Sequence, residues 1–154
     1  MTGSMSHAAA IGLGLAETDR SGGPVIVLDG DGALIMHLGI LSTIGRKGGK
    51  RLTHVVLDNG IYESTWRTKT TALTTQFGMV AGGCGYARSS ECCSPIDVGS
   101  AMHKALSGSR ASLIVIKVMH CNHEPPSIMA VAEPAQLAQN FRSGMINLRA
   151  DARI

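Results

Sequence analysis

Three short apolar runs stand out along the chain, each bounded by glycine, proline or polar residues. They cover residues 25–28, 52–57 and 112–118. Short runs that are rich in Val, Ile and Leu and do not alternate with polar residues are typical of strands buried on both faces of a parallel sheet. The pattern therefore predicts three strands in the interior of the protein.

Between these runs, apolar residues recur at the spacing of a helix. The first such segment, Ser4 to Glu17, can be capped by Ser4. Its Gly12 and Gly14 weaken a helix, so we expect both to be required by close packing against a neighbour. A cap residue, a proline and an acid in Ser94-Pro95-Ile96-Asp97 predict a helix that runs to Leu106. Further helices are expected at residues 33–47, 74–81 and 133–145, and a loop at 62–71.

Strands that alternate with helices predict an α/β fold, in which a parallel sheet is flanked by helices and joined by right-handed crossovers. At 154 residues, of which 44% are hydrophobic, the chain suits one domain with one core. Charged residues make up only 16%. Either the domain is simply rich in core residues, or it buries part of its surface against another chain.

Composition excludes several classes of function. The net charge is only +3, and no basic run is interleaved with aromatic residues, so we expect no nucleic-acid binding. No apolar run is long enough to span a membrane and the N-terminal region lacks a signal-peptide pattern, so a soluble cytoplasmic protein is expected. The four cysteines form no CxxC pair and are expected to be reduced thiols. A zinc site at His120, Cys121 and His123 is an alternative, although its spacing is unlike that of common zinc sites.

Two glycine-containing motifs follow the first two predicted strands. Gly30-Asp31-Gly32 follows the first strand, and Asp58-Asn59-Gly60 follows the second. The intervening helix rises about 21 Å and the second strand returns about 20 Å, so the chain comes back to the sheet edge that it left. If the two strands pair, Asp31 and Asn59 face one small volume, at the edge where open parallel sheets bind ligands.

The chemistry of these motifs suits a metal-bound phosphate group. A carboxylate, an amide oxygen and a backbone carbonyl match magnesium shared with a phosphate. Gly30 and Gly32 would let the backbone approach a diphosphate, towards which the helix near Ala33 would point its N–H groups. The alternative is that Gly-Asp-Gly is only a tight turn. A Rossmann dinucleotide site is disfavoured because no G-x-G-x-x-G joins the first strand to its helix.

The stretch from Gly30-Asp31-Gly32, through twenty-five residues, to Asp58-Asn59 resembles the thiamine diphosphate motif, GDG followed by about that interval and NN. Residues 3–7, 28–45 and 55–65 look like phosphonopyruvate decarboxylase and the sulfopyruvate decarboxylase β subunit. The resemblance covers residues 3–118 well. It implies the thiamine diphosphate-binding fold of the diphosphate-binding domain over residues 1–154, without the helix and strand that usually open it, and with a less similar tail at 119–154 that contains a helix. A fragment, a shortened subunit and a degraded gene product would each account for that start.

The resemblance also implies roles for individual residues. Asp31, the side chain of Asn59 and the carbonyl of Ile61 would bind Mg²⁺. Gly30, Gly32 and Ala33 would contact the diphosphate of thiamine diphosphate. The aminopyrimidine and the V-shaped cofactor would be held by Gly3, Ser4 and Met5. Tyr62, Glu63 and Ser64 would lie near the cofactor, with Glu63 and His7 near the reaction centre. His7 and His37 could each meet an anionic substrate head group, or be structural.

Three positions depart from the pattern of the family. Asp58 replaces the first Asn of the NN pair, Ser6 replaces the usual Gly after Met5, and residues 65–70 read TWRTKT where relatives have a GGQPT-like loop. Because that loop would border the substrate, the departures bear on which substrate is used.

The implied activity is decarboxylation of an acidic 2-oxo acid, phosphonopyruvate giving phosphonoacetaldehyde and CO₂. Alternatives are a sulfopyruvate decarboxylase β subunit, another thiamine diphosphate enzyme such as an acetolactate synthase or a benzoylformate-type decarboxylase, and a non-catalytic nucleotide-binding or orphaned domain. The glutamate that activates the cofactor lies in a separate pyrimidine-binding domain in this family. We therefore expect an oligomer in which a partner supplies that domain in trans, and no activity from the chain alone.

Overall fold

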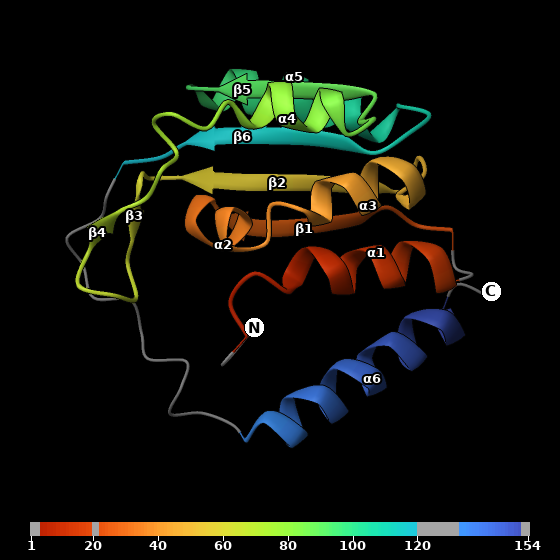
Figure 1. Ribbon diagram of the computed structural model, residues 1–154. Helices are drawn as coiled ribbons and strands as arrows, with labels where there is room; N and C mark the ends of the chain where they lie inside the picture. The colour runs from red at the N-terminus through yellow and green to blue at the C-terminus, as the bar shows by residue number, and fades with distance from the viewer. Residues whose placement is uncertain (1–3, 20–21, 120–132, 152–154) are drawn as a thin grey trace.

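The computed structural model describes residues 4–19, 22–119 and 133–151, with side chains up to residue 145 in the last range. Its centre is a parallel sheet of four strands in the order β1-β2-β6-β5 (Figure 1). The strands are β1 (Val25–Gly30), β2 (Leu52–Asp58), β6 (Ser112–Lys117) and β5 (Arg88–Cys92). The predicted α/β class and its three apolar strands are confirmed.

Strand β5 was not predicted, because its sequence, RSSEC, is polar. It lies at the edge of the sheet, where only Cys92 is fully covered. A polar segment can form such a strand because the pairing with β6 satisfies its backbone without burying its side chains. A second difference concerns residues 62–71, predicted as a loop. They contribute to a short antiparallel hairpin of β3 (Ile61–Tyr62) and β4 (Thr68–Lys69).

Helices cover both faces of the sheet. One face packs against helices α1 (Ala8–Thr18), α2 (Asp31–Met36), α3 (Ile40–Lys47) and α4 (Phe77–Gly83), and the other face packs against α5 (Pro95–Leu106). Figure 1 shows α1, α3 and α4 on one side of the strands and α5 behind them. Helix α6 (Pro134–Asp151) follows, and the side chains of its residues 134–144 are exposed.

The helix predictions need two corrections, and one is confirmed. The first helix begins at Ala8 rather than at Ser4, and its N-cap, His7, makes no side-chain capping bond. The reason lies at Ser6, whose φ of 79° is left-handed and incompatible with a helix. The single helix predicted for residues 33–47 is divided into α2 and α3 by residues 37–39. The predicted cap of α5 is confirmed, since Ser94 Oγ accepts a hydrogen bond from the Asp97 N–H at 3.3 Å.

Burial differs from prediction at β1. Ile26 and Leu28 are 44% and 66% exposed, so this strand is not buried on both faces in the described part of the chain. Helix α5 packs on the side chains of β2, β5 and β6 and does not reach the edge strand β1. Of the two glycines in α1, the prediction of close packing is confirmed for Gly12, where a Cβ would lie 2.2 Å from Val27 Cγ2. Among the described residues nothing lies within 4 Å of a Cβ added at Gly14, so close packing is not found there.

Candidate functional site

The carboxyl ends of β1 and β2 lie side by side. The two strands pair in parallel, with Gly30 opposite Leu57. The chain continues from Gly30 directly into α2 and from β2 into the turn that contains Asn59. The two motifs are thus brought to adjacent positions at one edge of the sheet.

Asp31 is the first residue of α2 and is almost completely buried, with 2% of its surface exposed. The Thr70 hydroxyl donates a hydrogen bond of 2.5 Å to Asp31 Oδ2. Thr70 is itself buried and follows strand β4. The orientation of the carboxylate is therefore determined by a residue 39 positions away in the sequence.

The turn after β2 is held by its own side chains. Asp58 Oδ1 accepts a hydrogen bond from the Gly60 N–H at 3.1 Å, and Asn59 Oδ1 accepts one from the Ile61 N–H at 3.0 Å. Gly60 adopts a φ of +73°, which glycine tolerates without a steric penalty. The Asn59 amide also donates to Glu63 Oε1 at 3.1 Å, so the amide group of Asn59 is fixed at both ends.

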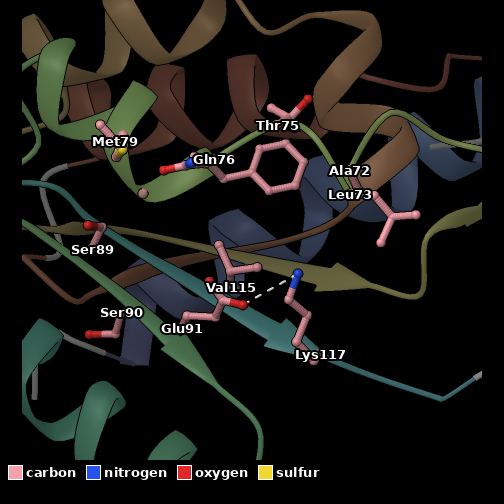
Figure 2. Close-up of a pocket in the computed structure, with 12 residues that line it drawn as sticks. Ala72, Leu73, Thr75, Gln76, Met79, Ser89, Ser90, Glu91, Val115 and Lys117 are labelled. Atoms are coloured by element: carbon pink, nitrogen blue, oxygen red, sulfur yellow. Dashed lines mark ion pairs between the residues drawn. The ribbon is translucent and has the colours of Figure 1, made fainter.

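Asp58, which replaces the first Asn of the family motif, is paired with a cation. Lys117, its neighbour on β6, places Nζ 2.6 Å from Asp58 Oδ2 and 3.4 Å from Glu91 Oε1. The hydrogen bond to Asp58 raises the pKa of Lys117 above its ordinary value. Figure 2 shows the ion pair between Lys117 and Glu91 as a dashed line, among the residues that line a separate cavity of about 510 Å³ beside α4. The added negative charge of Asp58 is thus compensated within the fold.

Ten of the predicted site residues line a single cavity of about 400 Å³. They are Met5, Gly30, Asp31, Gly32, Ala33, Asn59, Ile61, Tyr62, Glu63 and Ser64. Leu57 and Val118 complete the wall. Sequence reasoning missed these two because apolar residues at strand ends read as core, although their place at the carboxyl ends of two predicted strands was a signal.

Gly32 lies in close contact with the hairpin. A Cβ added to it would lie 2.5 Å from two ring carbons of Tyr62 and 3.3 Å from the methyl group of Thr70. Only glycine therefore fits between α2 and the β3–β4 hairpin. At Gly30 the corresponding space is open.

The segment before α1 contacts the cavity through Met5 and the end of α2 through His37. Met5 is 38% exposed and reaches the cavity. His37 Nδ1 donates to the Ser6 carbonyl at 3.3 Å, which holds the left-handed backbone of Ser6. This conformation explains why glycine is usual at that position. His7 places Nδ1 3.1 Å from the Met5 carbonyl and its ring 5.7 Å from that of His37.

Two predicted residues of this segment, His7 and Ser4, do not line the cavity, and Gly3 lies outside the described residues. The alternative zinc site at residues 120–123 also lies outside them. Within the residues that the structure describes, no three His, Cys, Asp or Glu side chains are grouped as metal ligands. In the same residues, no helix is both long and apolar enough to cross a bilayer.

The oxygen atoms at the two strand ends suit a hard cation. Asp31 contributes a carboxylate, Asn59 an amide oxygen and Ile61 a backbone carbonyl, all from residues that line the cavity. Mg²⁺ prefers such oxygen ligands and keeps further positions for phosphate and water. Among the described residues, no Lys, Arg or His forms an ion pair with the buried Asp31. A buried carboxylate without a protein counter-ion is stabilised by a bound cation.

Several known proteins are similar in sequence to this chain. Phosphonopyruvate decarboxylase of Streptomyces viridochromogenes is 36% identical over 148 residues, which are 93% of this chain and 35% of that protein. Sulfopyruvate decarboxylase subunit beta of Methanococcus maripaludis is 32% identical over 145 residues, 94% of this chain and 76% of that subunit. The same subunit of Methanocaldococcus jannaschii is 48% identical over 86 residues, which cover 55% of this chain and 45% of the subunit. The chain thus spans about a third of the length of the Streptomyces protein.

The fold has known counterparts among solved structures. The thiamine diphosphate-dependent 4-hydroxybenzoylformate decarboxylase of Rhodococcus jostii RHA1 superposes with a TM-score of 0.64 at 19% identity, over 77% of this chain and 24% of that one. Benzoylformate decarboxylase from Polynucleobacter necessarius gives a TM-score of 0.64 at 22% identity, over the same shares of the two chains. Residues 1–116 match the family described as thiamine pyrophosphate enzyme, C-terminal TPP binding domain. The chain therefore belongs to the thiamine pyrophosphate enzymes, as their C-terminal, cofactor-binding domain.

Proposed function

We propose that this chain is the diphosphate- and magnesium-binding part of a thiamine diphosphate-dependent decarboxylase of an acidic 2-oxo acid, with phosphonopyruvate as the favoured substrate. One observation carries the proposal: Asp31, Asn59 and Ile61 line one cavity at neighbouring strand ends. Relatives named phosphonopyruvate decarboxylase and sulfopyruvate decarboxylase support the class of reaction.

The residues of the cavity have separate tasks in this proposal. Asp31, Asn59 and the Ile61 carbonyl would hold Mg²⁺, and the backbone of Gly30, Gly32 and Ala33 would face the diphosphate. When bound, thiamine diphosphate supplies the electron sink that accepts the electron pair released as CO₂ leaves. Excluding water from that centre would be the task of the apolar wall, which consists of Met5, Leu57 and Val118.

Glu63 and Ser64 line the same cavity and would face the reacting end of the cofactor. The Glu63 carboxylate accepts a hydrogen bond from Asn59 and lies 3.9 Å from Arg67 Nε. This places an exposed cation of the hairpin beside the site, where it would attract an anionic head group. His7, predicted near the reaction centre, would act only indirectly, through the backbone of Met5.

A partner is part of the proposal. The cavity is open, and none of its residues is the activating glutamate of a pyrimidine-binding domain. We propose that this domain is supplied by another chain, so that the site is completed in an oligomer. The chain is similar to proteins named subunit beta, and the match to one of them covers 76% of that subunit's length. This similarity supports an arrangement with a second chain.

Two measurements test the proposal. Titration of the chain with thiamine diphosphate and Mg²⁺ should give saturable binding, which Asp31→Ala should abolish. With a pyrimidine-binding partner supplied, CO₂ release should be faster from phosphonopyruvate than from pyruvate. If Asp31→Ala binds thiamine diphosphate and Mg²⁺ as the wild type does, the metal site is refuted. If the chain binds nucleotides saturably but not thiamine diphosphate, it is a non-catalytic nucleotide-binding domain.

Sulfopyruvate is the second candidate substrate. The 48% identity to sulfopyruvate decarboxylase subunit beta over 86 residues favours it. Phosphonate and sulfonate groups differ in charge, so we expect the site to favour one of the two substrates. The same CO₂-release assay measures which one. Faster CO₂ release from sulfopyruvate than from phosphonopyruvate would assign the chain to the second reaction, and a preference for pyruvate would instead indicate an acetolactate synthase-like enzyme.

A further inference from the structure

We infer that Thr70 is a positioning residue, which orients the Asp31 carboxylate for metal binding and links it to the turn that carries Asn59. The inference rests on the proposed function and adds to it a residue that is not among those lining the cavity. Its basis is three hydrogen bonds made by this one threonine.

The direction of the Thr70 hydroxyl is determined by its surroundings. Thr70 Oγ1 accepts a hydrogen bond from the Ala72 N–H at 3.3 Å and donates its own proton to Asp31 Oδ2 at 2.5 Å. A hydroxyl has one proton, so while it donates to Asp31 it cannot donate elsewhere. Both side chains are buried, at 7% and 2% exposure, and water therefore competes little for the bond.

The backbone of Thr70 reaches the other half of the site. Its N–H donates to the Gly60 carbonyl at 2.9 Å, in the turn directly after Asn59. Thr70 thus contacts the segment that follows β1 through its side chain and the segment that follows β2 through its main chain. If these two segments moved relative to each other, the hydrogen bond from Thr70 to Asp31 or the one to Gly60 would have to break.

The bond also fixes the direction in which the Asp31 carboxylate faces. Oδ2 accepts the Thr70 hydroxyl proton, and each carboxylate oxygen keeps a lone pair with which it could bind a metal ion. Hydrogen bonds that fix a metal-binding side chain generally contribute about 10- to 100-fold to metal affinity. Loss of the Thr70 hydroxyl would leave the carboxylate free to rotate, and the ordering of Asp31 would then oppose metal binding.

The test compares Thr70→Val, which keeps the shape and removes the hydroxyl, with Thr70→Ser, which keeps the hydroxyl. Backbone amide signals of the isotope-labelled chain are followed by NMR during a Mg²⁺ titration at a constant excess of thiamine diphosphate. This method measures weak binding directly and does not depend on activity. We expect Thr70→Val to raise the Mg²⁺ dissociation constant at least about tenfold, and Thr70→Ser to stay within about threefold of the wild type.

Each outcome decides between the two proposals. Absence of any Mg²⁺-dependent shift in the wild type overturns the proposed function. Binding by the wild type that Thr70→Val leaves unchanged overturns only the role of Thr70. If Thr70→Val does not fold, Thr70→Ala replaces it. Failure of both to fold, or a lowered melting temperature with unchanged Mg²⁺ affinity, would assign Thr70 a purely structural role and overturn the inference.

Discussion

Helix α1 offers a prediction with an internal control, because it contains two glycines in opposite environments. Gly12 is buried against β1, where an added Cβ would lie 2.2 Å from Val27 Cγ2 and 3.6 Å from Leu52 Cδ1. Gly14, two residues later, has nothing within 4 Å of its added Cβ. Replacing each glycine by alanine therefore introduces the same methyl group once into a packed interface and once into open space.

The magnitudes follow from two opposing effects. Alanine favours an α-helix over glycine by about 1 kcal/mol at either position. At Gly12 the contact with Val27 is far below van der Waals distance, and Val27 is a buried β-branched residue whose side chain cannot easily rotate away. Overpacking of this kind costs about 1–3 kcal/mol. We expect Gly12→Ala to lower the free energy of unfolding by up to about 2 kcal/mol, the overpacking cost less the helix gain, and Gly14→Ala to raise it by about 1 kcal/mol.

Urea denaturation followed by far-UV circular dichroism measures both changes. The difference between the two variants is the packing effect alone, because the helix preference is common to both. If both variants shifted the urea midpoint by the same amount, with the slope of the unfolding transition unchanged, the packing of α1 on β1 would be refuted. A displaced α1 would also move Met5, so Gly12→Ala is expected to weaken thiamine diphosphate binding more than Gly14→Ala.

Three further predictions concern the site and its support. Gly32→Ala should weaken Mg²⁺–thiamine diphosphate binding at least about tenfold in a calorimetric titration, since the new methyl would displace the Tyr62 ring, 2.5 Å away. Lys117→Met should lower the free energy of unfolding in urea by about 1 kcal/mol, because it leaves the buried Asp58 without its cation while solvent already screens the half-exposed ammonium. Burial raises the pKa of Tyr86 far above its ordinary value. The unfolded state releases this proton above about pH 10, whereas the folded state retains it, so stability should fall as the pH rises past 10, and less in Tyr86→Phe.

Matched controls sharpen these predictions. Gly99→Ala places a methyl in open space among the described residues, on α5 and away from the cavity, and should leave binding nearly unchanged. Lys104→Met removes an exposed lysine of α5 and should leave stability nearly unchanged. Equal effects of the two lysine variants would contradict the structural role of Lys117. A Tyr86→Phe variant with the same alkaline pH profile as the wild type would show that other groups, such as Lys117, account for the loss of stability.

Much of this protein follows from local features of its sequence. The short apolar runs and the glycine motifs after them were enough to predict parallel strands and the sheet edge at which the two motifs meet. The cap at Ser94 and the proline after it predicted the start of α5, because capping depends on residues within one turn. The meeting of Asp31 and Asn59 at one cavity was predictable because consecutive parallel strands end at the same sheet edge, although the connection between them is two short helices, α2 and α3, rather than the one helix expected.

Other features were decided only by the tertiary structure, since they depend on residues far apart in the chain. The polar strand β5 forms because β6 offers it a pairing edge, not because its residues favour a strand. The left-handed Ser6 is held by His37, 31 positions away, and this contact moves the start of α1 from Ser4 to Ala8. The hydrogen bond from Thr70 to Asp31 joins residues that no periodicity relates. Sequence patterns report which face of an element is apolar, whereas only packing determines which distant side chain a buried polar group meets.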